Sequence, residues 1–137
     1  MIAVAESEEG LFLVEVGASA DEDELAGHEA AARVERPRPV DVVPAAISAT
    51  LVDVDARGSV VVVLVDRRPP LLVSYDAGQT WSDRGAGLPA GRAVALGANP
   101  DDVLYGARNR LYVSRDGGRF WRALGVELPE IRDVAWG

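Results

Sequence analysis

The chain has 137 residues, 48% of them hydrophobic, and a formal net charge of −8 at pH 7. This length and composition predict one folded domain with a hydrophobic core of ordinary size. The absence of cysteine excludes disulfides, thiolate nucleophiles and cysteine-ligated metal sites, and the excess of negative charge argues against nucleic acid or an anionic membrane as a main partner.

Two short apolar runs, at 2–5 and 11–16, are separated by a segment that contains Glu6, Glu8 and Glu9. The two runs predict a β-hairpin. Because the glutamates interrupt the apolar sequence and no basic segment precedes it, we expect neither a signal peptide nor a membrane span. The expected location is therefore cytoplasmic.

An acidic segment follows at 18–27, and a further strand is expected at 30–35. We interpret the acidic segment as a solvated loop, with a cation site or a partner-binding loop as alternatives. A short helix over 21–32 is another alternative, because this stretch is rich in Glu and Ala and begins with acids. His28 is expected to be an exposed loop residue, and as the one histidine of the chain it excludes a multi-histidine metal site.

The middle of the chain begins with Pro37, Pro39 and Pro44, which predict an extended connection without ladder hydrogen bonds. Strands are then expected at 47–54, 60–65, 71–74 and from Trp81, and again at 93–97, 103–107, 111–114, 121–124 and 133–136. The run at 60–65 contains only Val and Leu, which predicts a strand buried on both faces.

An eight-residue motif occurs twice. Ser74 to Trp81 reads SYDAGQTW and Ser114 to Trp121 reads SRDGGRFW, so the second copy begins 40 residues after the first. A fixed period of this length indicates a repeat architecture. The motif has the chemistry of a closed β-turn, because Asp accepts hydrogen bonds from turn amides, Gly can adopt positive φ and Trp can pack under the turn.

Both copies resemble the Asp-box, or BNR repeat, S-x-D-x-G-x-T-W, which occurs in sialidases, sortilin-like receptors and photosystem assembly factors. The second copy departs from the pattern in having Phe120 at the Thr position. In that family the box joins the third and fourth strands of a propeller blade and lies away from sialidase active sites. The resemblance implies a structural role for Ser74, Asp76, Gly78, Thr80, Trp81, Ser114, Asp116, Gly118 and Trp121.

The expected fold is all-β: a β-propeller of four-stranded antiparallel blades, three in each chain. Blade 1 would cover about 1–44 and be completed by 131–136, blade 2 about 45–90, and blade 3 about 91–130. Three blades are too few to close a ring, and closure removes exposed strand edges. We therefore expect a homodimer with six blades, in which 131–136 pairs with 2–5 of the partner chain. The alternative is a fragment of a longer protein.

Charged loops at the rim opposite the Asp-boxes are the candidate binding residues. Two blades place arginines there, Arg67, Arg68, Arg108 and Arg110, and the first blade places Glu6, Glu8 and Glu9. Convergent arginines can bind a carboxylate or phosphate, so the partner could be a protein, an anionic small molecule or a glycan. The alternative is that these charges form weak ion pairs between blades.

No set of catalytic residues can be assigned. Arginines are plentiful, but no Tyr and Glu pair with a separate Asp matches the sialidase arrangement, and the Asp-boxes lack the alternating carboxylates of a calcium loop. We expect no cofactor and no metal. The predicted function is a non-catalytic binding or assembly scaffold, with a glycosidase-like enzyme formed at the dimer axis or a purely structural homodimer as alternatives.

Overall fold

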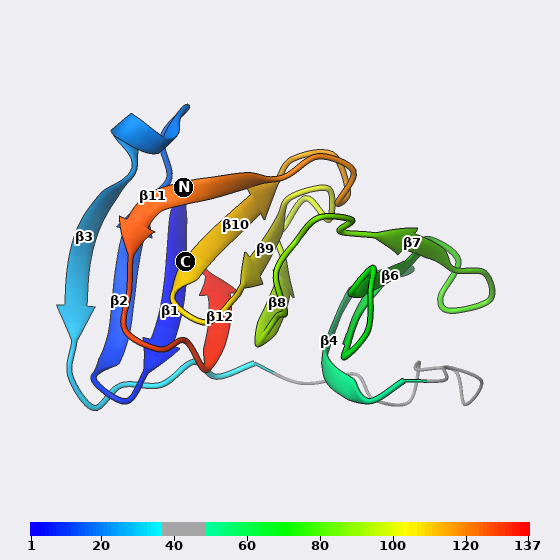
Figure 1. Ribbon diagram of the computed structural model, residues 1–137, viewed down its shortest axis with the longest axis horizontal. Coiled ribbons are helices and arrows are strands. Elements are labelled where there is room, and N and C mark those ends of the chain that lie inside the picture. Colours follow the sequence, from blue (N-terminus) through cyan, green and yellow to red (C-terminus); the bar gives the residue numbers. More distant parts are fainter. Residues whose placement is uncertain (37–48) are drawn as a thin grey trace.

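A computed structural model describes residues 1–36 and 49–137 of the chain, and this part is all-β, with no α-helix (Figure 1). The strands are β1 (Ile2–Ser7), β2 (Gly10–Glu15), β3 (Glu24–Glu29), β4 (Leu51–Arg57), β5 (Val60–Val65), β6 (Leu71–Ser74), β7 (Ser82–Arg84), β8 (Ala93–Leu96), β9 (Val103–Gly106), β10 (Arg110–Ser114), β11 (Arg122–Glu127) and β12 (Asp133–Trp136). One short 3-10 helix, η1, spans Ala20–Glu22.

The strands form three antiparallel four-stranded sheets. Sheet A has the order β12-β1-β2-β3, sheet B the order β4-β5-β6-β7, and sheet C the order β8-β9-β10-β11. Two sheets thus consist of four consecutive strands, and the third combines the first three strands with the last. The predicted grouping of the strands is confirmed.

The pairing of the two ends of the chain differs from the expectation in one respect. β12 pairs with β1, with Ala3 opposite Trp136, but both strands belong to the same chain, whereas the pairing was expected between two chains. The segment before β12 is fixed next to sheets C and A, because the amide of Ile131 donates to the carbonyl of Arg108 and that of Arg132 to the carbonyl of Glu6. The nearest open strand edge is therefore the chain's own β1, and sheet A is complete without a partner.

The fourth strand of sheet A is not where it was expected. β3 covers Glu24–Glu29 rather than 30–35, and the alternative helix over 21–32 is wrong, since only η1 forms there. β3 is an edge strand whose residues are mostly exposed, so its sequence lacks the apolar alternation that marks other strands. His28 is exposed as predicted, but it lies in β3 rather than in a loop, and its ring stacks on Phe12 with the centroids 4.3 Å apart.

Three expectations fall on residues that the structure leaves undescribed. The proline-rich connection and the boundary between the first two blades both lie within 37–48. The start of the strand expected at 47–54 also lies there, and the described strand β4 begins at Leu51.

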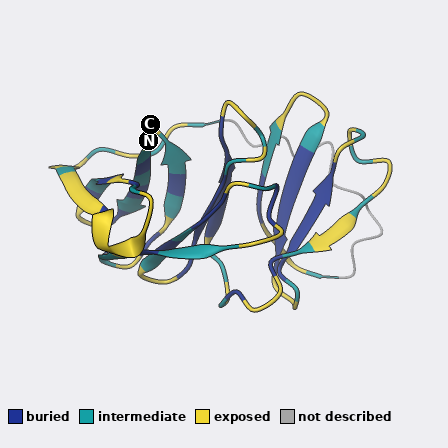
Figure 2. Cartoon of the chain, turned by 90° about the horizontal axis from the view of Figure 1, so that it is seen from above, coloured by how far each residue is buried: buried dark blue, intermediate teal, exposed yellow. Residues whose placement is uncertain are grey.

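Sheet C lies between sheets A and B (Figure 2), and its edge strand β8 contacts both β12 and β4. The interface of sheets A and C contains an apolar cluster with Val14, Leu104 and Leu111. The interface of sheets B and C contains a second cluster, with Leu64 and Tyr105 among its members. The molecule is therefore a row of three sheets that pack face to face.

The outer faces of the row differ. On sheet B, the outer face is apolar and buried, with Val61 1%, Val63 0% and Leu72 7% exposed. Because Val62 and Leu64 face sheet C, β5 is buried on both faces as predicted. On sheet A, the outer face carries Val4 paired with Leu13, and both side chains are only partly buried.

Candidate functional site

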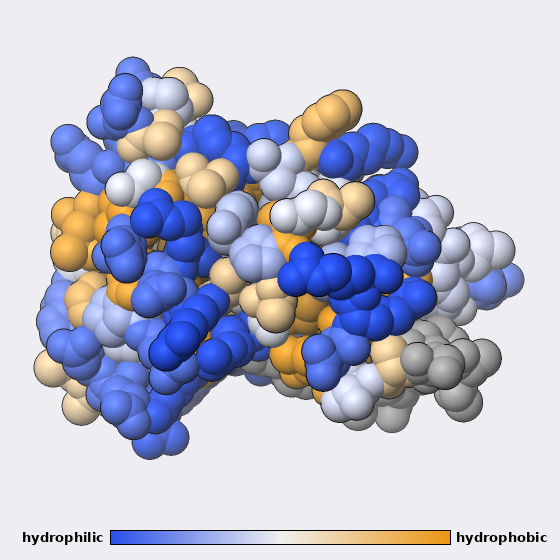
Figure 3. All heavy atoms as spheres, viewed as in Figure 1, coloured by the Kyte–Doolittle hydropathy of each residue, from blue (hydrophilic) through white to orange (hydrophobic). Residues whose placement is uncertain are grey.

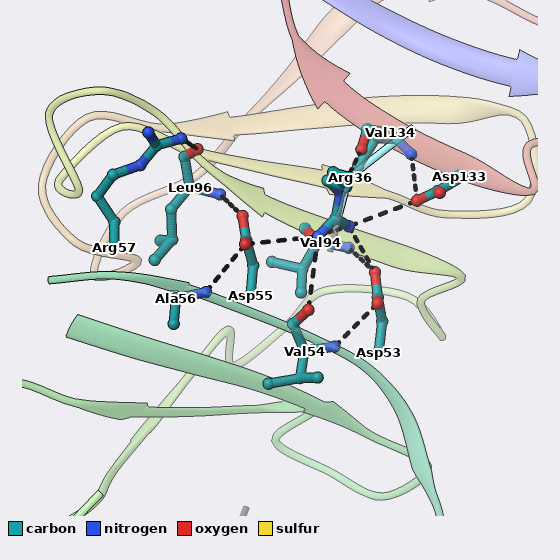
Figure 4. A network of polar contacts seen from close by, with 10 residues as sticks. All are labelled: Arg36, Asp53, Val54, Asp55, Ala56, Arg57, Val94, Leu96, Asp133 and Val134. Carbon is teal, nitrogen blue, oxygen red and sulfur yellow. Dashed lines mark hydrogen bonds and ion pairs between the residues drawn. The ribbon is translucent and has the colours of Figure 1, made fainter. Parts of the chain in front are cut away.

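The edge strands β4, β8 and β12 meet at one side chain, Arg36. Its guanidinium donates to the carbonyl oxygens of Val134 from Nε at 3.1 Å, Val54 from Nη1 at 3.4 Å and Val94 from Nη2 at 2.5 Å. These three valines lie one in each edge strand, at intervals of 40 residues along the chain. Arg36 therefore joins equivalent positions of all three sheets (Figure 4).

Acidic side chains from two of these strands neutralise the guanidinium. Asp53 lies 2.9 Å, Asp133 3.4 Å and Asp55 3.6 Å from its nitrogens. The Arg36 side chain is only 11% exposed, and that of Asp53 6%. A buried charge is costly unless it is paired and hydrogen-bonded, and here each charge has several partners.

Two of the aspartates also connect sheet B to sheet C through backbone amides. Oδ2 of Asp53 accepts from the amide of Val94 at 3.0 Å, and Oδ2 of Asp55 accepts from the amide of Leu96 at 2.8 Å (Figure 4). Both carboxylates are therefore already hydrogen-bonded to backbone amides, which leaves them poorly placed to act on a substrate.

A cavity of about 310 Å³ adjoins this network, with Glu35, Arg57 and Trp136 in its wall. Its volume is at the lower end for a small-molecule site. Arg57 is itself bonded, since its Nη2 lies 3.4 Å from the carbonyl oxygen of Leu96. The indole nitrogen of Trp136, in contrast, is buried and has no hydrogen-bond partner among the described residues.

The first Asp-box connects β6 to β7 in sheet B as a closed turn. Asp76 accepts from the Thr80 amide at 2.8 Å, from the Thr80 hydroxyl at 2.6 Å and from the Ser74 hydroxyl at 2.7 Å. These bonds, led by that of the Thr80 hydroxyl, lower the pKa of Asp76 from 3.8 to about 2. The Trp81 indole donates to the Gly78 carbonyl at 3.0 Å.

The second Asp-box connects β10 to β11 in sheet C with the same framework. Asp116 accepts from the Phe120 amide at 3.0 Å and the Ser114 hydroxyl at 2.7 Å, and the Trp121 indole donates to the Gly118 carbonyl at 2.7 Å. The pKa of Asp116 is also lowered, first by the amide of Phe120. The difference lies in Phe120, whose ring cannot replace the Thr80 hydroxyl.

The predicted arginines of the rim do not converge on one point. Arg67 pairs with Asp83 at 3.4 Å, and Arg68 donates to the carbonyl of Leu88 at 2.7 Å. Both line a cavity of about 200 Å³, which is small for a ligand.

The two arginines of the other rim loop each lie near a different glutamate. Arg108 is 3.7 Å from Glu130 and Arg110 is 3.9 Å from Glu127. All four carboxylate and guanidinium groups are well exposed, so these pairs contribute little stability.

The predicted glutamates lie in or beside the turn of the β1–β2 hairpin. Glu8 pairs with Arg132 at 2.7 Å, Glu6 accepts from the amide of Val34 at 2.8 Å, and the carbonyl of Glu9 contacts the ring of His28. The rim charges therefore form separate local contacts, which favours the ion-pair interpretation over a common anion site.

A second buried ion pair, between Asp23 and Arg122, was not predicted. The Asp23 side chain is 0% exposed and accepts from Arg122 at 2.7 Å and from the amides of Gly17 and Gly125, both at 2.9 Å. Burial alone would raise the pKa of Asp23, but the hydrogen bonds from Arg122, Gly125 and Gly17 lower it overall. The pair fixes the β2–β3 loop of sheet A against β11 of sheet C.

Neither Arg36 nor the Asp23–Arg122 pair could be found by a local motif. Arg36 precedes a proline-rich stretch, and three of its partners are backbone carbonyls, which carry no sequence signal. The members of the other pair are 99 residues apart. A partial signal existed, because Asp133 lies two 40-residue repeats after Asp53.

Comparison with known proteins yields no match to a family model, to a curated protein or to a solved structure. Among residues 1–36 and 49–137, no group of three or more His, Cys, Asp or Glu side chains is placed to hold a metal ion. The same residues include no helix of the length and apolar character needed to cross a membrane.

Proposed function

We propose that the chain is a non-catalytic binding or assembly module built from three blades of a β-propeller, with the Asp-boxes as structural turns. The 40-residue repeat, the three four-stranded sheets in a row and the position of each Asp-box between the third and fourth strands of its sheet all support this proposal. In a propeller the first strands of the blades surround a central channel. The corresponding edge strands here are β4, β8 and β12.

The observation that carries the proposal is the Arg36 network at the meeting point of these strands. An enzyme would need groups there that are free to act on a substrate, whereas Arg36, Asp53 and Asp55 bond to one another and to backbone groups. A general acid of a glycosidase also needs a raised pKa. The described carboxylates with a shifted pKa are Asp23, Asp76 and Asp116, and all three are lowered.

The outer face of sheet A supports assembly with a second copy of the chain. This face presents Ile2, Val4, Leu11 and Leu13, which are all partly exposed. Two chains of three blades would form a six-bladed ring, and a closed ring would cover this face. Because β12 completes sheet A within the chain, two chains that pack through the faces of their sheets need no strand exchange.

Solution mass tests this assembly. Size-exclusion chromatography with light scattering on the unmodified chain is expected to give the mass of two chains. Leu13→Arg, which places a charge on the outer face of sheet A, is expected to give the mass of one. Leu25→Arg is the matched control, because Leu25 is 51% exposed but pairs with Val14, whose side chain faces sheet C.

A single-chain mass for the unmodified protein at every concentration would contradict assembly with a second copy. A dimer that persists in Leu13→Arg would show that the chains meet through a different surface.

A further inference from the structure

A cavity of about 720 Å³ lies between the second Asp-box and the β2–β3 loop of sheet A. Its wall includes Val16 and Gly17 from sheet A, and Arg115, Phe120 and Trp121 from the Asp-box. A volume of this size fits a small ligand. The rim charges and the Arg36 network take no part in it.

The repeat explains why a cavity exists at this place. Between sheets B and C the two Asp-box turns touch, since a Cβ added at Gly117 would lie 2.6 Å from the hydroxyl oxygen of Tyr75. Arg115 is the equivalent of Tyr75, 40 residues later, but the next sheet, sheet A, has the β2–β3 loop instead of an Asp-box. Arg115 pairs with Asp102 of its own sheet at 3.0 Å. The space that an Asp-box turn of sheet A would fill therefore stays open.

The walls of this cavity are held firmly. Arg122, which also lines it, forms the buried ion pair with Asp23 and donates to the carbonyl of Gly17 at 2.9 Å. The ring of Trp121 is fixed by its bond to Gly118 and by edge contact with Tyr105, with 5.7 Å between centroids. A preformed site loses less entropy when a ligand binds.

The second Asp-box presents both apolar and polar groups to this space. Phe120 is 79% exposed, and Figure 3 shows apolar atoms protruding above the β10–β11 connection, where it lies. In the first box, Oδ2 of Asp76 accepts from the Thr80 hydroxyl. Within the residues that the structure describes, Oδ2 of Asp116 accepts no such bond, because Phe120 stands at that position.

We propose that this cavity binds a neutral saccharide, whose ring stacks on Phe120 and whose hydroxyl donates to Oδ2 of Asp116. A sugar combines an apolar ring face with hydroxyls, and a hydroxyl would restore the bond that Thr80 makes in the first box. A cationic ligand would meet the guanidiniums of Arg115 and Arg122, and an anionic one the carboxylate of Asp116, whereas a neutral polyol avoids both repulsions.

The test is saturation-transfer NMR on the full chain with glucose, galactose, mannose and N-acetylglucosamine, each at about 10 mM, which detects millimolar affinity. At least one sugar is expected to show transfer. Phe120→Thr removes the aromatic surface, and the new hydroxyl can donate to Oδ2 of Asp116 in place of the sugar. The dissociation constant of the sugar is therefore expected to rise about tenfold. This variant restores the usual Asp-box sequence, so it is not expected to unfold.

The matched control is Leu25→Thr, which replaces another exposed apolar side chain, on β3 and outside the cavity wall. It should bind the same sugar as tightly as the unmodified chain. The proposal is overturned if none of the four sugars shows transfer, or if the sugar that binds does so equally well to Phe120→Thr.

Discussion

The two interfaces of sheet C both contain an apolar cluster, but they differ at one position of the repeat. Toward sheet B, carboxylates of Asp53 and Asp55 accept hydrogen bonds from the amides of Val94 and Leu96. Toward sheet A, the residues 40 positions after these aspartates are Ala93 and Ala95, which pack in an apolar cluster. The same repeat position therefore serves polar bonding in one interface and close apolar packing in the other.

This difference shows how a repeat can place the same strands with different side chains. Carboxylates that bond to a neighbour's backbone fix that neighbour's register, while small side chains let the next sheet approach closely. Arg36 links both interfaces, because it contacts an edge strand of every sheet.

Removal of Arg36 is expected to have the largest effect on stability. Arg36→Met keeps most of the apolar length but leaves the buried Asp53 and the partly buried Asp133 without this guanidinium. Breaking a buried ion pair from one side costs about 3–5 kcal/mol, so urea unfolding should show a loss of that order. Arg33→Met, at an exposed position of the same segment, should change the free energy of unfolding little. Equal values for the two variants would contradict the linking role of Arg36.

The close approach of sheets A and C can be tested at Gly106. A Cβ at this position would lie 2.8 Å from Cγ1 of Val134 and 3.1 Å from Cγ2 of Ile131. Overpacking of this kind costs about 1–3 kcal/mol, so Gly106→Ala should lower the midpoint of thermal unfolding. Gly87 cannot serve as the control. A Cβ added there would meet no atom within 4 Å, but its positive φ of 87° would strain an alanine. An unchanged midpoint for Gly106→Ala would mean that the interface is looser than described.

The polar contacts between sheets B and C can be tested at Asp55. Asp55→Ala removes the acceptor for the amides of Leu96 and Ala56. An unsatisfied buried donor costs about 1–3 kcal/mol, and chemical denaturation should show a loss in this range, toward its lower end because Asp55 is partly exposed. Asp66→Ala, on the exposed loop after β5, is the control. No difference between the two would show that the carboxylate does not connect the sheets.

The smallest effect is expected at the Asp-box turn that contacts sheet C through Tyr75. The pKa of Asp76 is lowered from 3.8 to about 2 in the folded protein. The contribution of Asp76 to folding stability is therefore complete above pH 3.8 and is lost as the pH falls toward 2. Thr80→Val removes the hydroxyl that contributes most to this shift. Thermal unfolding between pH 4 and 2 should therefore depend less on pH in Thr80→Val, and an unchanged dependence would contradict the assignment.

Much of the fold could be predicted because the repeat is visible in the sequence. The spacing of Ser74 and Ser114 gave the period. The equivalent position of β12 predicted its pairing with a first strand, although with that of a partner chain rather than the chain's own β1. β3 was misplaced because an exposed edge strand carries no apolar pattern. Arg36 was missed because it bonds to backbone carbonyls of three strands, and only the fold brings these carbonyls together.

Hydrogen exchange at the guanidinium of Arg36 tests most directly that the three edge strands meet at a structural link rather than at an active centre. NMR can compare the Nε–H of Arg36, which donates to Val134, with that of the exposed Arg33. The Nε–H of Arg36 is expected to exchange with water much more slowly than that of Arg33. Equally fast exchange for both would show that Arg36 is free in solution and that the proposed link does not exist.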